Sequence, residues 1–90
     1  MISGEIDHYA AGPIRDEIDE MIRRTRPIEL VLDFNDVQFM DSSGIGLVMG
    51  RYKLMKTIGG NVSITNVRQH IYKIMLMSGV QKIASISERK

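Results

Sequence analysis

The sequence contains no cysteine, no tryptophan and only two prolines. Small secreted domains usually depend on disulfides, so the lack of cysteine favours a reducing compartment, and we expect a cytoplasmic protein. No apolar run approaches the ~20 residues that a membrane-spanning helix needs. The first residues also lack the basic and apolar segments of a signal peptide, and we expect no membrane partner.

An excess of charge of one sign is also missing. The net charge is +1, so no overall field attracts nucleic acid, and we expect no nucleic-acid partner. The basic residues are scattered, and we expect Arg51, Lys53 and Lys56 on a solvated helix face. Hydrophobic residues make up 43% of the 90 residues and charged residues 26%, which is the balance of one small globular domain.

Glycine and proline separate helical patterns from strand patterns. Apolar residues at helical spacing predict helices over about residues 9–24, 43–58 and 68–77. Pro13 is expected in the first turn of the first helix, and Pro27 is expected to stop it. Strand patterns cover residues 28–34, 61–65 and 80–86, and Ile83 is the best core candidate of the last. Residues 1–3 resemble the tail of a strand, Asn35-Asp36 a turn, and residues 87–90 a frayed end.

The expected order is β-α-β-α-β-α-β. Such alternation predicts an α/β domain with a small, mostly parallel sheet of about four strands and helices mainly on one face. Three glycines, Gly44, Gly46 and Gly50, fall inside the second predicted helix, where each costs ~1 kcal/mol relative to alanine. Their roughly helical spacing predicts close packing of that helix on the sheet.

A polar cluster, Asp41-Ser42-Ser43, stands between a strand and the second helix. Any of the three side chains is suited to cap the first helical turn. The hydroxyl of Ser42 is alternatively presented for modification, because a phosphate there would face the positive end of the helix dipole. Phosphorylation would add close to two negative charges at one point. The two interpretations are compatible if Ser43 caps the helix while Ser42 is exposed.

Enzymatic chemistry is not indicated. The nucleophile pattern G-x-S-x-G needs a glycine where Met40 stands. The two histidines, His8 and His70, are not spaced as a metal pair, and we expect His70 on a helix surface. No phosphate loop is present, and Gly44-Ile45-Gly46 lacks the third glycine of a dinucleotide motif. We therefore expect no catalytic residue, metal or cofactor, and weak nucleotide binding stays an open alternative.

The segment from Asp41 to Lys53, DSSGIGLVMGRYK, resembles the signature of the anti-sigma factor antagonists in the STAS domain superfamily. Two flanking segments, Gly4-Glu5-Ile6-Asp7-His8 and Met77-Ser78-Gly79-Val80, resemble two further motifs of that family, in the right order. The resemblance covers essentially the whole chain. The stretch Gly50-Arg51-Tyr52-Lys53 narrows the resemblance to the sporulation branch of the family, the anti-sigma F factor antagonists.

This resemblance implies a partner-switching regulator. The unphosphorylated antagonist would bind an anti-sigma factor that is also a serine kinase, and so release the sporulation sigma factor. Phosphorylation of Ser42 would end the binding, and a phosphatase would restore it. The matching partner-binding positions are Asp7, Asp41, Ser43, Gly44, Ile45 and Gly46, although a core position suits Ile45 better. The alternatives are a stress-response antagonist or other STAS scaffold, and a small nucleotide-binding protein.

The family pattern also contains an edge strand before the Gly4 motif and a further helix at the end. On this comparison we expect residues 1–90 to form a single STAS domain truncated at both ends.

Overall fold

Five strands and three helices make up residues 3–89, the part of the chain that the structure, a computed structural model, describes. Met1, Ile2 and Lys90, for which a strand tail and a frayed end were expected, lie outside that part. The elements in chain order are β1 (Ser3–Ile6), α1 (His8–Thr25), β2 (Glu29–Asp33), β3 (Asp36–Met40), α2 (Ser42–Thr57), β4 (Asn61–Val67), α3 (Gln69–Ser78), the 3-10 turn η1 (Val80–Lys82) and β5 (Ser85–Glu88).

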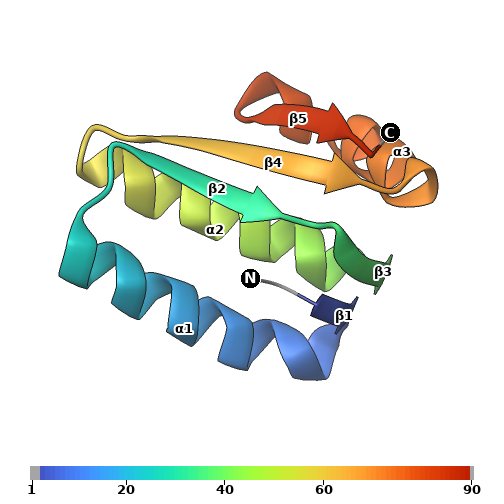
Figure 1. The fold of residues 1–90 in the computed structure, drawn as a ribbon, viewed down its shortest axis with the longest axis horizontal. Coiled ribbons are helices and arrows are strands. Elements are labelled where there is room, and N and C mark those ends of the chain that lie inside the picture. The colour runs from blue at the N-terminus through green and yellow to red at the C-terminus, as the bar shows by residue number, and fades with distance from the viewer. Residues whose placement is uncertain (1–2, 90) are drawn as a thin grey trace.

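All strand pairings within residues 3–89 are parallel, as the alternating order predicts. One sheet has the order β2-β4-β5, and a second small sheet pairs β1 with β3. The arrows of β2, β4 and β5 point the same way in Figure 1, and each helix runs back in the opposite direction. The carboxyl ends of the strands and the amino ends of the helices therefore gather at one edge of the molecule.

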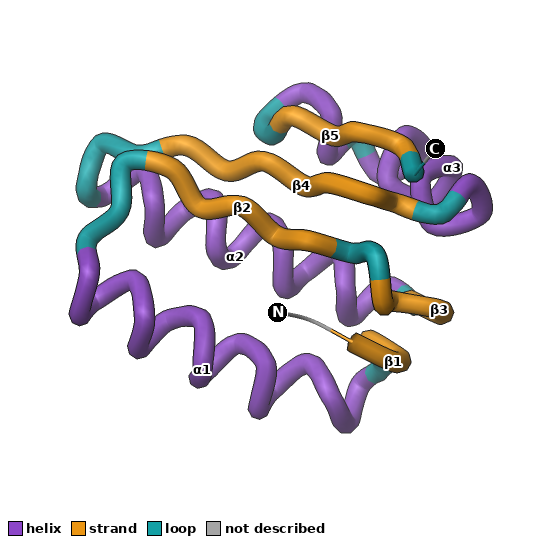
Figure 2. Tube along the Cα trace, viewed as in Figure 1, coloured by secondary structure: helices purple, strands orange, loops and turns teal. Residues whose placement is uncertain are grey.

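The hydrophobic core lies between the larger sheet and the helices. Leu30 and Leu32 on β2 and Val62 and Ile64 on β4 are buried on one sheet face, and α1 and α2 run along that side (Figure 2). The opposite face carries more exposed residues such as Val31. This confirms the predicted α/β fold with parallel pairing and helices mainly on one face, but the single sheet of about four strands is instead a three-stranded and a two-stranded sheet.

Helix α1 begins one residue earlier than predicted, at His8, because the side chain of Asp7 caps it. Pro13 lies inside the helix and not in the first turn, where the sequence placed it, so one internal N–H···O bond is missing there. The helix ends before Pro27, as predicted. The C-cap Arg26 is in the left-handed region with φ 44°, and its N–H donates to the Ile22 carbonyl at 2.8 Å.

Residues 36–40 form a strand, β3, which the sequence did not predict. Its burial does not alternate, since Val37 and Met40 are buried whereas Gln38 and Phe39 are exposed. The register with β1 also shifts between Gly4 and Glu5. An interrupted pattern of this kind lacks the period of two that indicates a strand.

The predicted last strand was placed too early. Val80 begins the turn η1, and β5 follows at Ser85–Glu88. The segment expected to fray is in fact paired, because Arg89 N–H donates to the Val67 carbonyl of β4 at 2.7 Å. Val80 is fully buried, whereas Ile83 is only partly buried against the core.

Candidate functional site

The helices α1 and α2 begin side by side at the edge where the strands end. Ile6 and Met40, the last residues of β1 and β3, pair with each other. Each is followed by an aspartate, Asp7 or Asp41, that opens a helix. The N–H of Asp41 donates to the Ile6 carbonyl at 3.2 Å, so the two helix starts are joined through the backbone.

Both aspartates act as N-caps. Asp7 Oδ1 accepts from the N–H groups of Tyr9 at 3.0 Å and Ala10 at 2.9 Å. Asp41 Oδ1 accepts from Ser43 N–H at 2.8 Å. The carboxylates thus satisfy first-turn donors that would otherwise lack partners. The sequence left Asp41, Ser42 and Ser43 open as caps of α2, and the structure gives the role to Asp41 and not to Ser43.

Ser42 is therefore the first residue of α2, one position earlier than the predicted helix start. It is exposed, and because Asp41 caps the helix its hydroxyl has no capping role. Ser43 is half-buried and faces the neighbouring helix α1 through a shared groove. The two serines thus differ in access, with Ser42 on the outside and Ser43 toward the inside.

The next three residues differ in the same way. Gly44 is buried, and a Cβ at this position would overlap the Cγ and Sδ of Met40. Ile45 is partly buried and packs against the core, the position that the sequence favoured for it. Gly46 is exposed and has open space where a Cβ would be, as does the half-buried Gly50. The predicted close packing of three glycines therefore holds only for Gly44.

A groove of about 390 Å³ separates the first halves of α1 and α2. Its lining residues are His8, Ala11, Gly12, Arg15, Ser43, Gly46, Leu47 and Arg51. The sequence did not place His8, Arg15 or Arg51 at the site. Their side chains meet the motif only because the two helices pack together, which no local pattern in either helix indicates.

Arg51 is buried, with 7% of its surface exposed, and not on a solvated face as predicted. Its Nε lies 2.7 Å from Oδ1 of Asp19 on α1. Burial lowers the pKa of Arg51, and the nearby Asp19 carboxylate opposes that shift. Arg15, at the same groove, pairs with Asp16 at 3.0 Å. Both groove arginines are therefore already balanced by carboxylates.

The remaining chemistry is sparse. His70 is exposed, as predicted, and lies beside β3, with its Nε2 3.0 Å from the Gln38 carbonyl oxygen. Within residues 3–89, no group of three His, Cys, Asp or Glu side chains is arranged to hold a metal ion. In the same part of the chain, no helix is both long and apolar enough to cross a membrane.

A family model of the STAS domain matches residues 1–89. The chain belongs to the STAS domain family. This STAS domain is 38% identical to an anti-sigma F factor antagonist of Paenibacillus polymyxa, over 99% of the chain and 76% of the relative. It is 30% identical to an anti-sigma-B factor antagonist of Bacillus subtilis, over 98% of the chain and 79% of the relative. Within the family it therefore belongs with the anti-sigma factor antagonists, which are regulatory proteins and not enzymes.

Solved structures agree with this assignment. The anti-sigma factor antagonist SpoIIAA in its unphosphorylated form is 30% identical, with a TM-score of 0.82 over 94% of this STAS domain and 74% of that chain. A crystal structure from Thermotoga maritima gives a TM-score of 0.88 over 98% of this domain and 75% of that chain. Its identity is 18%, so it supports the fold alone.

Proposed function

We propose that this STAS domain is an anti-anti-sigma factor whose binding is switched off by phosphorylation of Ser42. In the unphosphorylated state it binds an anti-sigma factor that is also a serine kinase, and so releases a sporulation sigma factor. The kinase uses ATP to modify Ser42, and a phosphatase removes the phosphate. The observation that carries the proposal is the exposed Ser42 hydroxyl at the start of α2, beside an aspartate that already caps the helix.

The docking surface in this proposal surrounds Ser42. Ser43 and Gly46 contribute from α2, and the N-cap residues Asp41 and Asp7 contribute from just before α2 and α1. Gly44 is buried, so it acts by seating the helix against Met40 and not by contact. Ile45 has only part of its side chain available, since the rest packs on the core.

Charge explains how the phosphate would end binding. Asp7 and Asp41 already place two carboxylates at the helix starts, so a phosphate on Ser42 adds a third and stronger negative group there. A desolvated interface accepts such a charge only when the partner supplies a paired cation. The complex would therefore dissociate without any change of fold.

The choice of partner rests on similarity. The identity of 38% to an anti-sigma F factor antagonist exceeds the 30% to an anti-sigma-B factor antagonist, which favours the sporulation partner. A relative solved in its unphosphorylated form is consistent with regulation by phosphorylation. Parallel affinity measurements with a sporulation and a stress-response anti-sigma factor would separate the two branches. Tighter binding to the stress-response factor would favour that alternative.

The direct test is incubation with a sporulation anti-sigma factor kinase and ATP, followed by intact mass measurement and peptide mapping. We expect one added phosphate, located on Ser42. The Ser42→Ala variant should gain no phosphate and should still bind the anti-sigma factor. Ser43→Ala is the matched variant, because it removes the neighbouring hydroxyl and should still gain one phosphate on Ser42, although more slowly since Ser43 belongs to the docking surface. Normal phosphorylation of Ser42→Ala would move the site to Ser43.

A further inference from the structure

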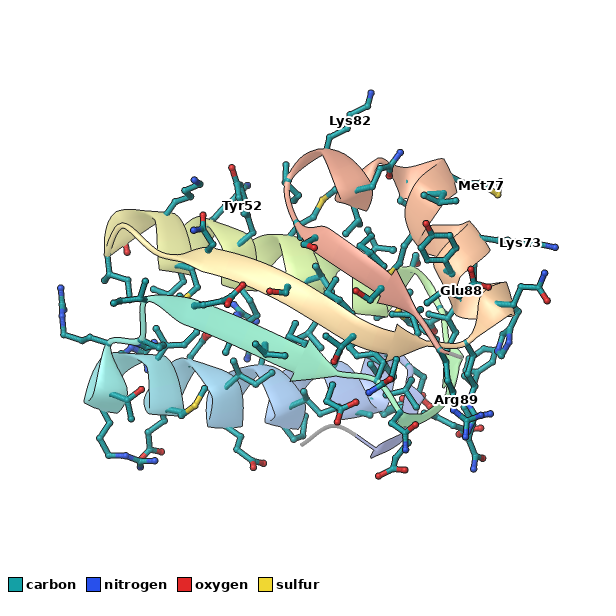
Figure 3. The ribbon with its side chains drawn as sticks, turned by 45° about the horizontal axis from the view of Figure 1, so that its top comes forward. Tyr52, Lys73, Met77, Lys82, Glu88 and Arg89 are labelled. Atoms are coloured by element: carbon teal, nitrogen blue, oxygen red, sulfur yellow. The ribbon has the colours of Figure 1, made fainter. Side chains whose placement is uncertain are left out.

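A second charged feature lies at the edge where β4 and β5 end. A pocket of about 380 Å³ is lined by Arg68, Gln69, His70 and Arg89. It shares no lining residue with the groove between α1 and α2. Figure 3 shows Arg89 at the lower right, at the end of β5, with Tyr52 of α2 at the upper left. The proposed function makes no use of this pocket.

Three side chains of the pocket are held in place by neutral oxygens of Asn35 and of β3. Arg68 Nε donates to the Val37 carbonyl at 3.0 Å, and Arg89 Nε donates to Asn35 Oδ1 at 3.2 Å. His70 Nε2 lies 3.0 Å from the Gln38 carbonyl oxygen, which can only accept a hydrogen bond, so the ring donates there. A guanidinium has five N–H donors, so each arginine keeps donors for a ligand.

Among residues 3–89, no carboxylate forms an ion pair with the arginines of this pocket. The ion pairs found among residues 3–89 involve Arg15, Arg24 and Arg51, and none involves Arg68 or Arg89. This contrasts with the groove beside Ser42, where both arginines are paired with carboxylates. Two guanidinium groups that line one pocket, with no carboxylate partner in the described part of the chain, repel each other, and a bound anion would offset that repulsion.

The backbone adds donors to the same pocket. Helix α3 has Arg68 at its N-cap position, and no side chain caps it. The N–H groups of Ile71 and Tyr72 bond to the Arg68 carbonyl, at 3.0 and 2.8 Å. The first two N–H groups have no partner within the helix, and they belong to Gln69 and His70, which line the pocket.

We infer that this pocket binds a phosphate-class oxyanion, either free phosphate or the phosphate of a small monoester. Two arginine side chains from different elements and two backbone N–H groups supply donors from several directions, which suits a tetrahedral oxyanion. A planar carboxylate would use a single guanidinium fork and leave the remaining donors unpaired. The site lies beyond the proposed function and does not depend on it.

The test is titration of the whole chain with inorganic phosphate and, separately, with phenyl phosphate, at constant ionic strength. Amide chemical shifts in ¹H–¹⁵N spectra report the binding, and we expect saturable shifts for Gln69 and His70. Arg89→Gln should weaken binding at least tenfold, and Arg68→Gln should do the same. Arg23→Gln is the matched control, because Arg23 is exposed in the last turn of α1, outside the pocket, and should bind like the unchanged protein.

The two probes identify the source of the anion. Tighter binding of phenyl phosphate supports a monoester ligand, and equal or tighter binding of inorganic phosphate supports the free ion. Absence of saturable shifts with both probes would overturn the inference, and so would unchanged binding by Arg89→Gln. If Arg68→Gln fails to fold, Arg89→Gln decides alone, since its backbone bond to Val67 does not need the side chain.

Discussion

At the start of α2, three consecutive side chains, those of Asp41, Ser42 and Ser43, each carry an oxygen that can cap a helix. The sequence identified the cluster but left the capping residue open. The outcome depends on the residue at which the backbone turns helical, and a difference of one residue decides it. Because the helix begins at Ser42, the Asp41 carboxylate reaches Ser43 N–H and the Ser42 hydroxyl is left exposed.

Replacing Gly44 should disturb the packing of α2 against the core below the candidate site. A Cβ there would overlap the buried Met40 side chain, so Gly44→Ala should lower the free energy of unfolding by about 1–3 kcal/mol. Urea unfolding measures the change. Gly46→Ala is the control, because it meets open space inside a helix and should stabilise the protein by roughly 0.5–1 kcal/mol. Equal effects of the two substitutions would contradict the packing role of Gly44.

Among the elements, the two strands without a clean apolar period are the ones that the sequence missed or misplaced. Helix α1 and strand β2 follow their periods of 3.6 and 2 closely, and the structure places them within about two residues of the expectation. Strand β3 was missed because its burial does not alternate. Strand β5 was misplaced because its residues, SISE, are mostly polar, and its pairing with β4 is a long-range interaction that the local pattern does not contain.

The contact between α1 and α2 could not be predicted from the sequence either. Arg51 was grouped with Lys53 and Lys56 on a solvated face, yet residues 51 and 53 differ by about 200° around a helix. Arg51 therefore faces α1 and forms an ion pair with Asp19, whereas Lys53 is exposed. Only the packing of the two helices decides which of these cations is buried.

Removing one partner of the Asp19–Arg51 pair should be costly. Arg51→Met would leave the Asp19 carboxylate, 9% exposed, without a counter-charge, and should lower the free energy of unfolding by about 3 kcal/mol. The double change Asp19→Leu with Arg51→Met removes both charges and should recover most of that loss. Thermal or urea unfolding of the single and double variants measures both effects.

The exposed pair of Arg24 and Glu20, 3.8 Å apart on α1, provides the comparison. Arg24→Met should change the free energy of unfolding by less than about 1 kcal/mol, because water screens this pair. A similar small effect for Arg51→Met would mean that burial does not control the strength of the Asp19–Arg51 interaction.

At the scale of the whole molecule, the parallel arrangement of the strands could be predicted from the sequence. Which side chains come together at the helix starts could be predicted only in part. Alternating strands and helices require all helix starts to lie at one edge, which brings Asp7 and Asp41 together. The family resemblance named both residues. It did not indicate the groove with Arg15 and Arg51, or the separate pocket of Arg68 and Arg89, because those depend on how helices and strand ends pack in space.

If phosphorylation acts through surface charge, a negative charge at position 42 should leave the fold intact. The dipole of α2 favours Ser42→Asp by about 0.3–1 kcal/mol, and repulsion from the adjacent Asp41 opposes it by about 1 kcal/mol in water. These contributions nearly cancel, so the free energy of unfolding should change by less than about 1 kcal/mol. Urea unfolding and calorimetric binding to the anti-sigma factor should show nearly unchanged stability but at least tenfold weaker binding.

The matched variant Ser42→Lys separates charge from size. A lysine at position 42 interacts unfavourably with the dipole of α2 but is attracted to Asp41, so the two contributions again nearly cancel and the fold should persist. Because its charge has the opposite sign, any weakening of partner binding by Ser42→Lys reports side-chain bulk rather than negative charge. A switch that works by charge predicts that Ser42→Asp weakens binding more than Ser42→Lys does, although aspartate is the smaller side chain. The reverse order, or unfolding of Ser42→Asp, would show that the phosphate ends binding by crowding the interface or by disrupting α2.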